Sequence, residues 1–180
     1  MSRNSAGRTQ EVPTRGEPGH DQIAELYREH AVSLIRAAVL LVGDRASAED
    51  VVQDAFFGLY RSWAGLRDPD KAVGYLRVAV LNGCRSVLRG RRRARLPSGL
   101  EHDPSVWSAE SAVLARENVR EVLAALARLP RRQREVLVLR YFLDLSEQQT
   151  ADTLKVRRGT VASTRHQALA SLIKDLEGKQ

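Results

Sequence analysis

The sequence predicts an all-α protein made of two small helical domains joined by a flexible acidic linker. Three observations support this prediction: apolar residues recur at helical spacing, segments containing Pro and Gly divide the chain, and no stretch alternates as a strand would. With 43% hydrophobic and 28% charged residues, the chain can bury a core. The breaks predict a disordered tail over 1–19, a first domain over 20–95, a linker over 96–113 and a second domain over 114–180.

The first domain is expected to hold three helices, over residues 21–41, 47–63 and 71–93. The residues before them are polar and rich in Gly, Pro, Ser and Arg, a composition typical of disorder. Gly43 and Asp44 separate the first two helices, and Ser47 with Asp50 resembles a capping box at the start of the second. The second helix is expected to bury Val51, Val52, Ala55, Phe56, Leu59, Tyr60 and Trp63.

The second domain is expected to hold two helices, over about 110–129 and 131–143, and then two shorter helices separated by a tight turn. Pro130 separates the first pair. In the second pair, Ser146 and Gln149 fit a capping box, Val156 fills the turn, and Val161 opens the apolar stripe of the last helix. This spacing is that of a helix-turn-helix.

Cationic and hydroxyl side chains gather where the last helix begins. In a helix-turn-helix, this end of the second helix enters the DNA major groove and reaches phosphates and base edges. The candidate DNA-binding residues are Arg157, Arg158, Thr160, Ser163, Thr164 and Arg165. The alternative is a helix pair that packs only on its own domain, but the cations lie where a reading helix needs them.

Charge and cysteine usage narrow the class of protein. The net charge is +7, which favours a polyanionic partner. Six arginines and no acid lie in residues 85–95, whereas residues 96–115 carry three acids and no base. Cys84 is the single cysteine, so an internal disulfide and a zinc site of several thiolates are excluded, and we expect a buried thiol.

The sequence gives no indication of an enzyme, a cofactor or a metal site. Its four histidines lack the HExxH spacing, and no P-loop or nucleophile elbow is present. No apolar run approaches the ~18 residues of a membrane span, and no signal peptide is visible. We therefore expect a cytoplasmic protein that does not insert into a membrane.

Three sequence blocks carry a family resemblance. They are GDRASAEDVVQDAFFGLYRSW at residues 43–63, YLRVAVLNGCRSVLRGRRR at residues 75–93, and LPRRQREVLVLRYFLDLSEQQTADTL followed by GTVASTRHQAL in the second domain. In this order and spacing they resemble the extracytoplasmic-function (ECF) sigma factors, a compact two-domain class of bacterial RNA polymerase specificity subunit. The composition, rich in Arg, Ala, Leu and Val, also resembles that of actinobacterial proteins.

The resemblance implies two binding surfaces on the first domain. The 47–63 helix would grip the coiled-coil clamp of the largest polymerase subunits through Asp50, Gln53, Asp54, Phe57 and Arg61. An exposed aromatic beside acids and an amide suits a protein contact better than a solvated acidic face does. The 71–93 helix would recognise and melt the promoter's minus-ten element through Arg77, Asn82, Arg85 and Arg89.

Several residues keep two interpretations or depart from the family pattern. Trp63 and Tyr75 could stack on unpaired bases or belong to the core. The arginine run 91–93 could be a solvated helix end, although its position favours phosphate contacts. Lys155 stands where the family's turn usually has glycine, and Arg157 stands where a Ser or Thr cap is common. A positive φ at Lys155 would cost about 1 kcal/mol.

The resemblance implies an alternative sigma factor that binds core RNA polymerase, directs it to specific promoters and helps melt the minus-ten region, while the second domain reads the minus-thirty-five element. Its implied partners are core RNA polymerase, promoter DNA and, as for most such factors, an anti-sigma factor. One alternative is a stand-alone helix-turn-helix regulator, which would leave block 43–63 unexplained. Another is an interaction protein that shares the helical architecture, against which the basic recognition helix argues.

Overall fold

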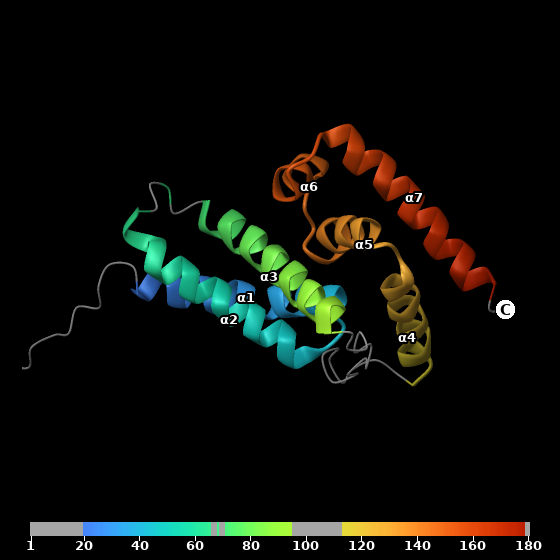
Figure 1. Ribbon diagram of the computed structural model, residues 1–180, viewed down its shortest axis with the longest axis horizontal. Coiled ribbons are helices and arrows are strands. Elements are labelled where there is room, and N and C mark those ends of the chain that lie inside the picture. The colour runs from blue at the N-terminus through green and yellow to red at the C-terminus, as the bar shows by residue number, and fades with distance from the viewer. Residues whose placement is uncertain (1–19, 66–67, 69–70, 95–112, 179–180) are drawn as a thin grey trace, which may run out of the picture.

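The computed structural model describes residues 20–65, 68, 71–94 and 113–178. These residues form helices and turns, without a strand among them, which confirms the all-α prediction. The expected tail over 1–19 and nearly all of the expected linker over 96–113 lie outside the described residues. The helices form an N-terminal part, α1 to α3, and a C-terminal part, α4 to α7 (Figure 1).

The N-terminal part is a bundle of three helices that all contact one another. It comprises α1 (His20–Val42), α2 (Arg45–Ser62), the 3₁₀ turn η1 (Trp63–Gly65) and α3 (Ala72–Ala94). The apolar spacing predicted these three helices to within three residues at each end, because one face of each had to be buried.

The start of α2 differs from the prediction. Gly43 has a φ of 93°, a left-handed conformation that glycine adopts without steric cost, and it ends α1. Asp44 then caps α2, because its carboxylate accepts a hydrogen bond of 2.9 Å from the backbone N–H of Ser47. The predicted capping box of Ser47 and Asp50 is therefore wrong: Ser47 is already inside the helix and supplies the N–H that is capped.

The C-terminal part comprises α4 (Val113–Arg128), α5 (Arg131–Leu137), the π-helical turn η4 (Val138–Phe142), α6 (Glu147–Leu154) and α7 (Arg158–Glu177). The single helix predicted over 131–143 is thus an α-helix that widens into a π turn. The N–H of Leu143 donates to the carbonyl of Val138 at 3.2 Å, as a π turn requires. Apolar spacing does not distinguish so short a π segment from α-helix.

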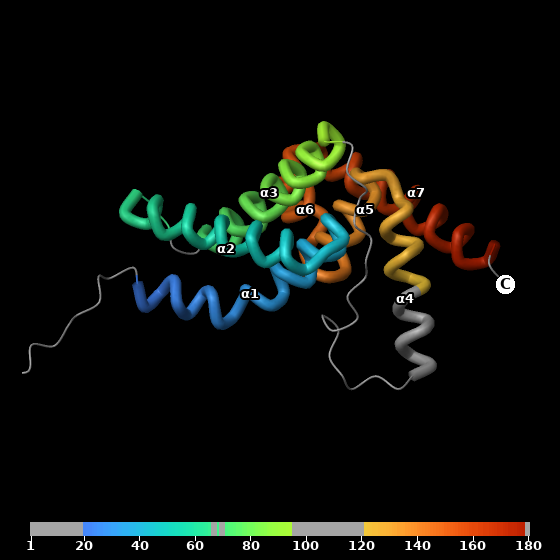
Figure 2. Tube along the Cα trace, turned by 60° about the horizontal axis from the view of Figure 1, so that its bottom comes forward, coloured from blue at the N-terminus to red at the C-terminus, as the bar shows by residue number. Residues whose placement is uncertain are grey.

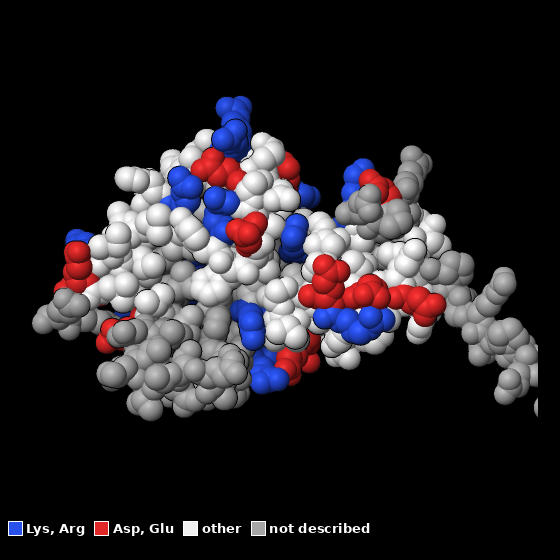
Figure 3. Space-filling view, turned by 180° about the vertical axis from the view of Figure 1, so that it is seen from behind, with Lys and Arg blue, Asp and Glu red and all other residues white. Residues whose placement is uncertain are grey.

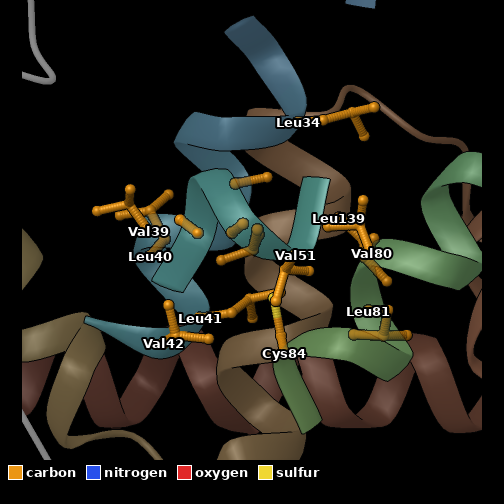
Figure 4. Packing of buried hydrophobic residues seen from close by; sticks show 14 of the residues in the cluster. Leu34, Val39, Leu40, Leu41, Val42, Val51, Val80, Leu81, Cys84 and Leu139 are labelled. Carbon is orange, nitrogen blue, oxygen red and sulfur yellow. The ribbon is translucent and has the colours of Figure 1, made fainter. Parts of the chain in front are cut away.

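The two parts share one hydrophobic core. α1 packs against α4, α5 and η4, and α3 packs against α6. Leu139 of η4 belongs to the same buried cluster as Val80 and Leu81 of α3 (Figure 4). Viewed from another side, α5 and α6 lie next to the N-terminal bundle rather than apart from it (Figure 2). The described helices therefore form one closed body.

Cys84 is buried in this core, as predicted. It lies next to Val51 of α2 and is 1% exposed (Figure 4). Burial raises the pKa of its thiol to about 12, so the group is neutral at physiological pH. Cys84 is a small packing residue of the α2–α3 contact.

Candidate nucleic-acid interface

The first helix of the helix-turn-helix begins with the predicted capping box. The N–H of Gln149 donates to Ser146 Oγ at 3.1 Å, and the N–H of Ser146 donates to Gln149 Oε1 at 2.8 Å. The first N–H groups of a helix have no carbonyl of a preceding turn to donate to, and the capping box gives two of them an acceptor. Ala151 and Leu154 on the inner side of this helix are buried, which fixes α6 against the rest of the domain.

The turn between α6 and α7 is a Schellman motif. The N–H of Lys155 donates to the Asp152 carbonyl at 3.2 Å, and the N–H of Val156 donates to the Ala151 carbonyl at 2.9 Å. This motif needs a left-handed residue, and Lys155 supplies it with a φ of 55°. The expectation of a positive φ at a lysine is confirmed.

The recognition helix α7 exposes its first turns. The side chain of Arg157, at the cap position, forms no capping hydrogen bond with the helix. Four candidates are exposed and two, Thr164 and Arg165, are half-buried; the exposed ones are Arg157, Arg158, Thr160 and Ser163. Val161 and Ala168 are buried, and Thr164 and Arg165 lie next to them around the helix. The structure therefore brings all six predicted residues together along the first two turns of one helix.

An acid that no sequence pattern indicated, Glu147, lies against this cluster. The carboxylate of Glu147, on α6, accepts a hydrogen bond of 3.2 Å from Arg158 Nε. Its other oxygen lies 3.2 Å from Arg165 Nη1. Glu147 also lines a shallow groove with Arg140, Asp144, Gln148 and Arg158. Glu147 stands at the start of α6, before the turn that leads to α7, so only the folded structure brings its side chain to the two arginines.

The four predicted minus-ten residues on α3 have different environments. Asn82 and Arg89 are exposed. Arg77 is half-buried, and burial lowers the pKa of its guanidinium without a compensating acid. Arg85 donates to Glu135 of α5 through two hydrogen bonds, of 2.8 and 2.7 Å. Arg85 is thus engaged with the C-terminal part of the same chain.

Glu135 is the centre of a cluster of arginines between the two parts. Its side chain is 1% exposed, and hydrogen bonding to it raises the pKa of Arg85. Arg131 and Arg132, one turn before it on α5, each lie 3.5 Å from its oxygens. A carboxylate this deeply buried needs such partners, because an unpaired buried charge is strongly destabilising.

The arginine run at the end of α3 is divided between two environments. Arg91 is mostly buried and holds the α1–α2 turn: it donates to the Val42 carbonyl at 2.6 Å and to Ser47 Oγ at 2.8 Å, and it forms an ion pair with Asp44. The prediction of a phosphate contact is therefore wrong for Arg91, because its donors bind the protein. Arg92 and Arg93 are exposed.

The predicted polymerase-binding residues are all exposed on α2: Asp50, Gln53, Asp54, Phe57 and Arg61. Phe57 is 57% exposed. Gln53 and Phe57 line an apolar groove between α1 and α2, whereas Asp54 lines a second groove between α2 and α3. Three of the five residues thus line two adjacent grooves, and Asp50 and Arg61 line neither.

Two aromatic residues extend the first groove. Tyr60, predicted to be buried, is 46% exposed, and Tyr27 of α1 is 50% exposed. Tyr27 packs edge-on against Phe56 with ring centroids 5.0 Å apart. Exposed aromatics gathered in one groove are typical of a protein-binding surface. Of the two proposed stacking residues, Trp63 packs partly against the core and Tyr75 is 38% exposed.

Charges on the remaining surface are mixed. On the face seen from behind, Lys and Arg lie next to Asp and Glu in several small groups separated by uncharged surface (Figure 3). Within the described ranges, no three His, Cys, Asp or Glu side chains could together hold a metal ion. No helix in these ranges is long and apolar enough to cross a bilayer.

Two family models match the chain. Sigma-70 region 2 matches residues 26–94, and Sigma-70, region 4 matches residues 119–172. A Streptomyces avermitilis protein named RNA polymerase sigma-E factor is 34% identical over 158 residues, 88% of this chain and 87% of that relative. The ECF RNA polymerase sigma factor SigL of Mycobacterium tuberculosis strain Erdman is 32% identical over 152 residues, 82% of this chain and 84% of that relative.

Two solved structures are also similar. One is CnrH in complex with the cytosolic domain of CnrY, with a TM-score of 0.66 and 26% identity over 88% of this chain and 89% of that one. The other is RpoE in complex with the anti-sigma factor NepR from Bartonella quintana, with a TM-score of 0.67 over 89% of this chain and 99% of that one. At 22% identity the second likeness shows the fold alone.

Proposed function

The chain belongs to the sigma-70 family of RNA polymerase sigma factors, in its extracytoplasmic-function class, and we propose that it is an alternative sigma factor that directs core RNA polymerase to specific promoters in the cytoplasm. One observation carries the proposal: a single chain holds both an exposed aromatic groove on α1 and α2 and a helix-turn-helix whose reading helix begins with exposed cations.

The α1–α2 groove is the proposed docking site for core polymerase. Gln53, Phe57, Asp50 and Arg61 offer hydrogen bonds, an apolar anchor and charges of both signs within a few turns. A buried aromatic at the centre of a polar rim is the usual arrangement of a protein interface. Asp54 would contribute from the neighbouring groove.

Promoter recognition is proposed to divide between the two parts. Arg157, Arg158, Thr160, Ser163, Thr164 and Arg165 would contact the minus-thirty-five element, and Arg77, Asn82, Arg85 and Arg89 the minus-ten element. Arg85 uses Nε and Nη2 on Glu135 here, so those N–H groups could donate to DNA only if the ion pair breaks. Polymerase, by fixing the spacing of the two parts, would raise the effective concentration of each for its element.

A protein that masks these surfaces is the expected regulator. Both similar structures are complexes: CnrH is bound to the cytosolic domain of CnrY, and the sigma factor RpoE is bound to the anti-sigma factor NepR. The apolar α1–α2 groove of this chain would suit an anti-sigma helix as well as the polymerase.

Selection of duplexes from a random library tests the proposed function. The library is offered to core polymerase alone, to the chain alone and to both together, and bound fragments are sequenced. We expect a two-block motif to be enriched only when both proteins are present. If the chain alone enriched a motif, and adding polymerase did not change that motif, the chain would be a stand-alone regulator and not a sigma factor.

A further inference from the structure

Glu147 bridges the two arginines within the recognition helix, Arg158 and Arg165. Arg158 and Arg165 are seven residues apart, which is two helical turns, so both point from the same face of α7. The Glu147 carboxylate is 21% exposed and lies 3.2 Å from each of them, through one oxygen each. It is therefore a negative charge placed inside the cationic cluster.

Capping α6 does not explain this placement. The cap of α6 is completed by Ser146 and Gln149, which satisfy each other's N–H groups. A negative charge in the first turn favours a helix in whichever direction its side chain points. The direction of the Glu147 side chain, across to α7, is therefore a separate feature that concerns the arginines.

The bridged arginines keep donors for DNA. A guanidinium carries five N–H groups, and Glu147 engages Nε of Arg158 and Nη1 of Arg165. Glu147 does not engage the terminal nitrogens of Arg158, or Nε and Nη2 of Arg165. Fixing a flexible side chain before binding reduces the conformational entropy lost on binding.

The same carboxylate acts against indiscriminate phosphate binding. Non-specific affinity for DNA comes almost entirely from cations that neutralise phosphates. Glu147 carries one negative charge beside two such cations, so it lowers their combined charge from two to one and repels a phosphate that approaches them. A base edge that accepts hydrogen bonds carries no full charge, so it is repelled less than a phosphate.

We propose that Glu147 is a positioning residue that sets the selectivity of the recognition helix: it holds Arg158 and Arg165 for base edges and weakens their attraction to phosphates. This inference rests on the proposed function, since it concerns how α7 reads duplex DNA. It concerns discrimination between sequences rather than overall affinity.

Glu147→Gln tests the proposal, because it keeps the size of the side chain and removes the charge. The full chain with core polymerase is titrated with two duplexes of equal length, the fragment selected from the library and the same fragment with its upstream block scrambled. We expect affinity for the scrambled duplex to rise about three- to tenfold, with a smaller change for the selected one. The salt dependence should steepen by about one, since each added phosphate contact contributes about 0.9.

Asp152→Asn is the matched control. Asp152 is also on α6 and exposed, and its carboxylate accepts from Gln148 of the same helix, so the charge change is identical without touching α7. The control should leave both discrimination and salt dependence unchanged. Glu147→Asp, which keeps the charge on a shorter arm, should retain the weak binding to the scrambled duplex.

An unchanged ratio of the two affinities in Glu147→Gln would overturn the role of Glu147. An equal loss for both duplexes is one such case, and it is the result expected if the residue only supports the fold. A wild-type chain that does not prefer the selected duplex would instead overturn the proposed reading by α7.

Discussion

At the scale of single residues, Lys155 has a conformation that favours glycine. Its φ of 55° lets the backbone close the Schellman motif between α6 and α7. A β-carbon in this region approaches the following carbonyl, which costs about 1 kcal/mol. The turn of the helix-turn-helix therefore keeps its shape despite the lysine, at some loss of stability.

Lys155→Gly should raise the free energy of unfolding by about 0.5–1 kcal/mol, because the β-carbon is removed where φ is positive. Urea denaturation followed by circular dichroism measures the change. Lys155→Ala is the control: it removes the same charge and keeps the β-carbon. Equal stabilisation by alanine and glycine would show that the charge, and not the backbone, is responsible.

Asp44 links stability to pH. Burial raises the pKa of its carboxyl, but hydrogen bonds from Ser47 and Arg91 outweigh burial and lower that pKa below the usual 3.8. The stabilisation is therefore present above pH 3.8 and is lost as the pH falls through the lower, folded-state pKa. Asp44→Asn should cost about 1 kcal/mol at neutral pH, where the wild-type carboxylate pairs with Arg91.

Urea denaturation at pH 7 and near pH 3 checks the Asp44 prediction. The difference between wild type and Asp44→Asn should shrink at the lower pH, because the wild-type carboxyl is then becoming protonated. Asp50→Asn changes an exposed acid on the same helix and should cost less at both values. A difference that stays constant with pH would contradict the assignment of the stabilisation to the Asp44 carboxylate.

At the scale of elements, the helices were predictable and their contacts were not. Spacing of apolar residues requires only neighbours along the chain, so α1, α2 and α3 were found nearly in full. Two local features could not be read from apolar spacing. The cap of α2 depends on the positive φ of Gly43, and the η4 turn depends on which carbonyl each N–H group binds. The pairing of Arg85 with Glu135 joins positions fifty residues apart, which no local pattern encodes.

In the candidate sites too, residues on one helix could be predicted from the sequence and contacts between helices could not. The six residues at the start of α7 share one helix, so the sequence could group them. Glu147 lies on a different helix, and Arg91 turned away from solvent toward Val42 and Asp44. The sequence did not predict the contacts of these two side chains, because their partners belong to other elements of the fold.

The faces of α2 give a prediction about polymerase binding. Asp54→Lys should weaken binding of core polymerase about tenfold, because it reverses a charge beside the proposed docking groove. Glu25→Lys makes the same reversal on α1 at an exposed residue outside both grooves, and it should have little effect. Fluorescence anisotropy of the labelled chain measures both, and equal affinities for Asp54→Lys and wild type would exclude Asp54 from the contact.

At the scale of the whole molecule, the N-terminal and C-terminal parts close on each other through one core and the Arg85–Glu135 pair. In this closed body Arg85 cannot donate to DNA with the same N–H groups. The aromatic groove of α1 and α2, by contrast, remains open to a partner.

Glu135→Gln should weaken the contact between the two parts, because it removes the buried charge that Arg85, Arg131 and Arg132 surround. Small-angle X-ray scattering should then report a larger radius of gyration than for wild type. Asp175→Asn, which breaks an ion pair with Arg128 inside the C-terminal part, is the control and should leave the radius unchanged. A radius unaffected by Glu135→Gln would mean that the apolar contacts alone hold the two parts together.

Run-off transcription on the fragment selected from the random library tests most directly whether this chain is a sigma factor. Purified core polymerase, the chain, and both together are supplied with the same template. We predict transcripts with one defined start only when both proteins are present, and their loss with Arg165→Glu, which reverses a charge in the recognition helix. Defined starts without the chain, or none with it despite polymerase binding, would contradict a role in promoter-specific initiation.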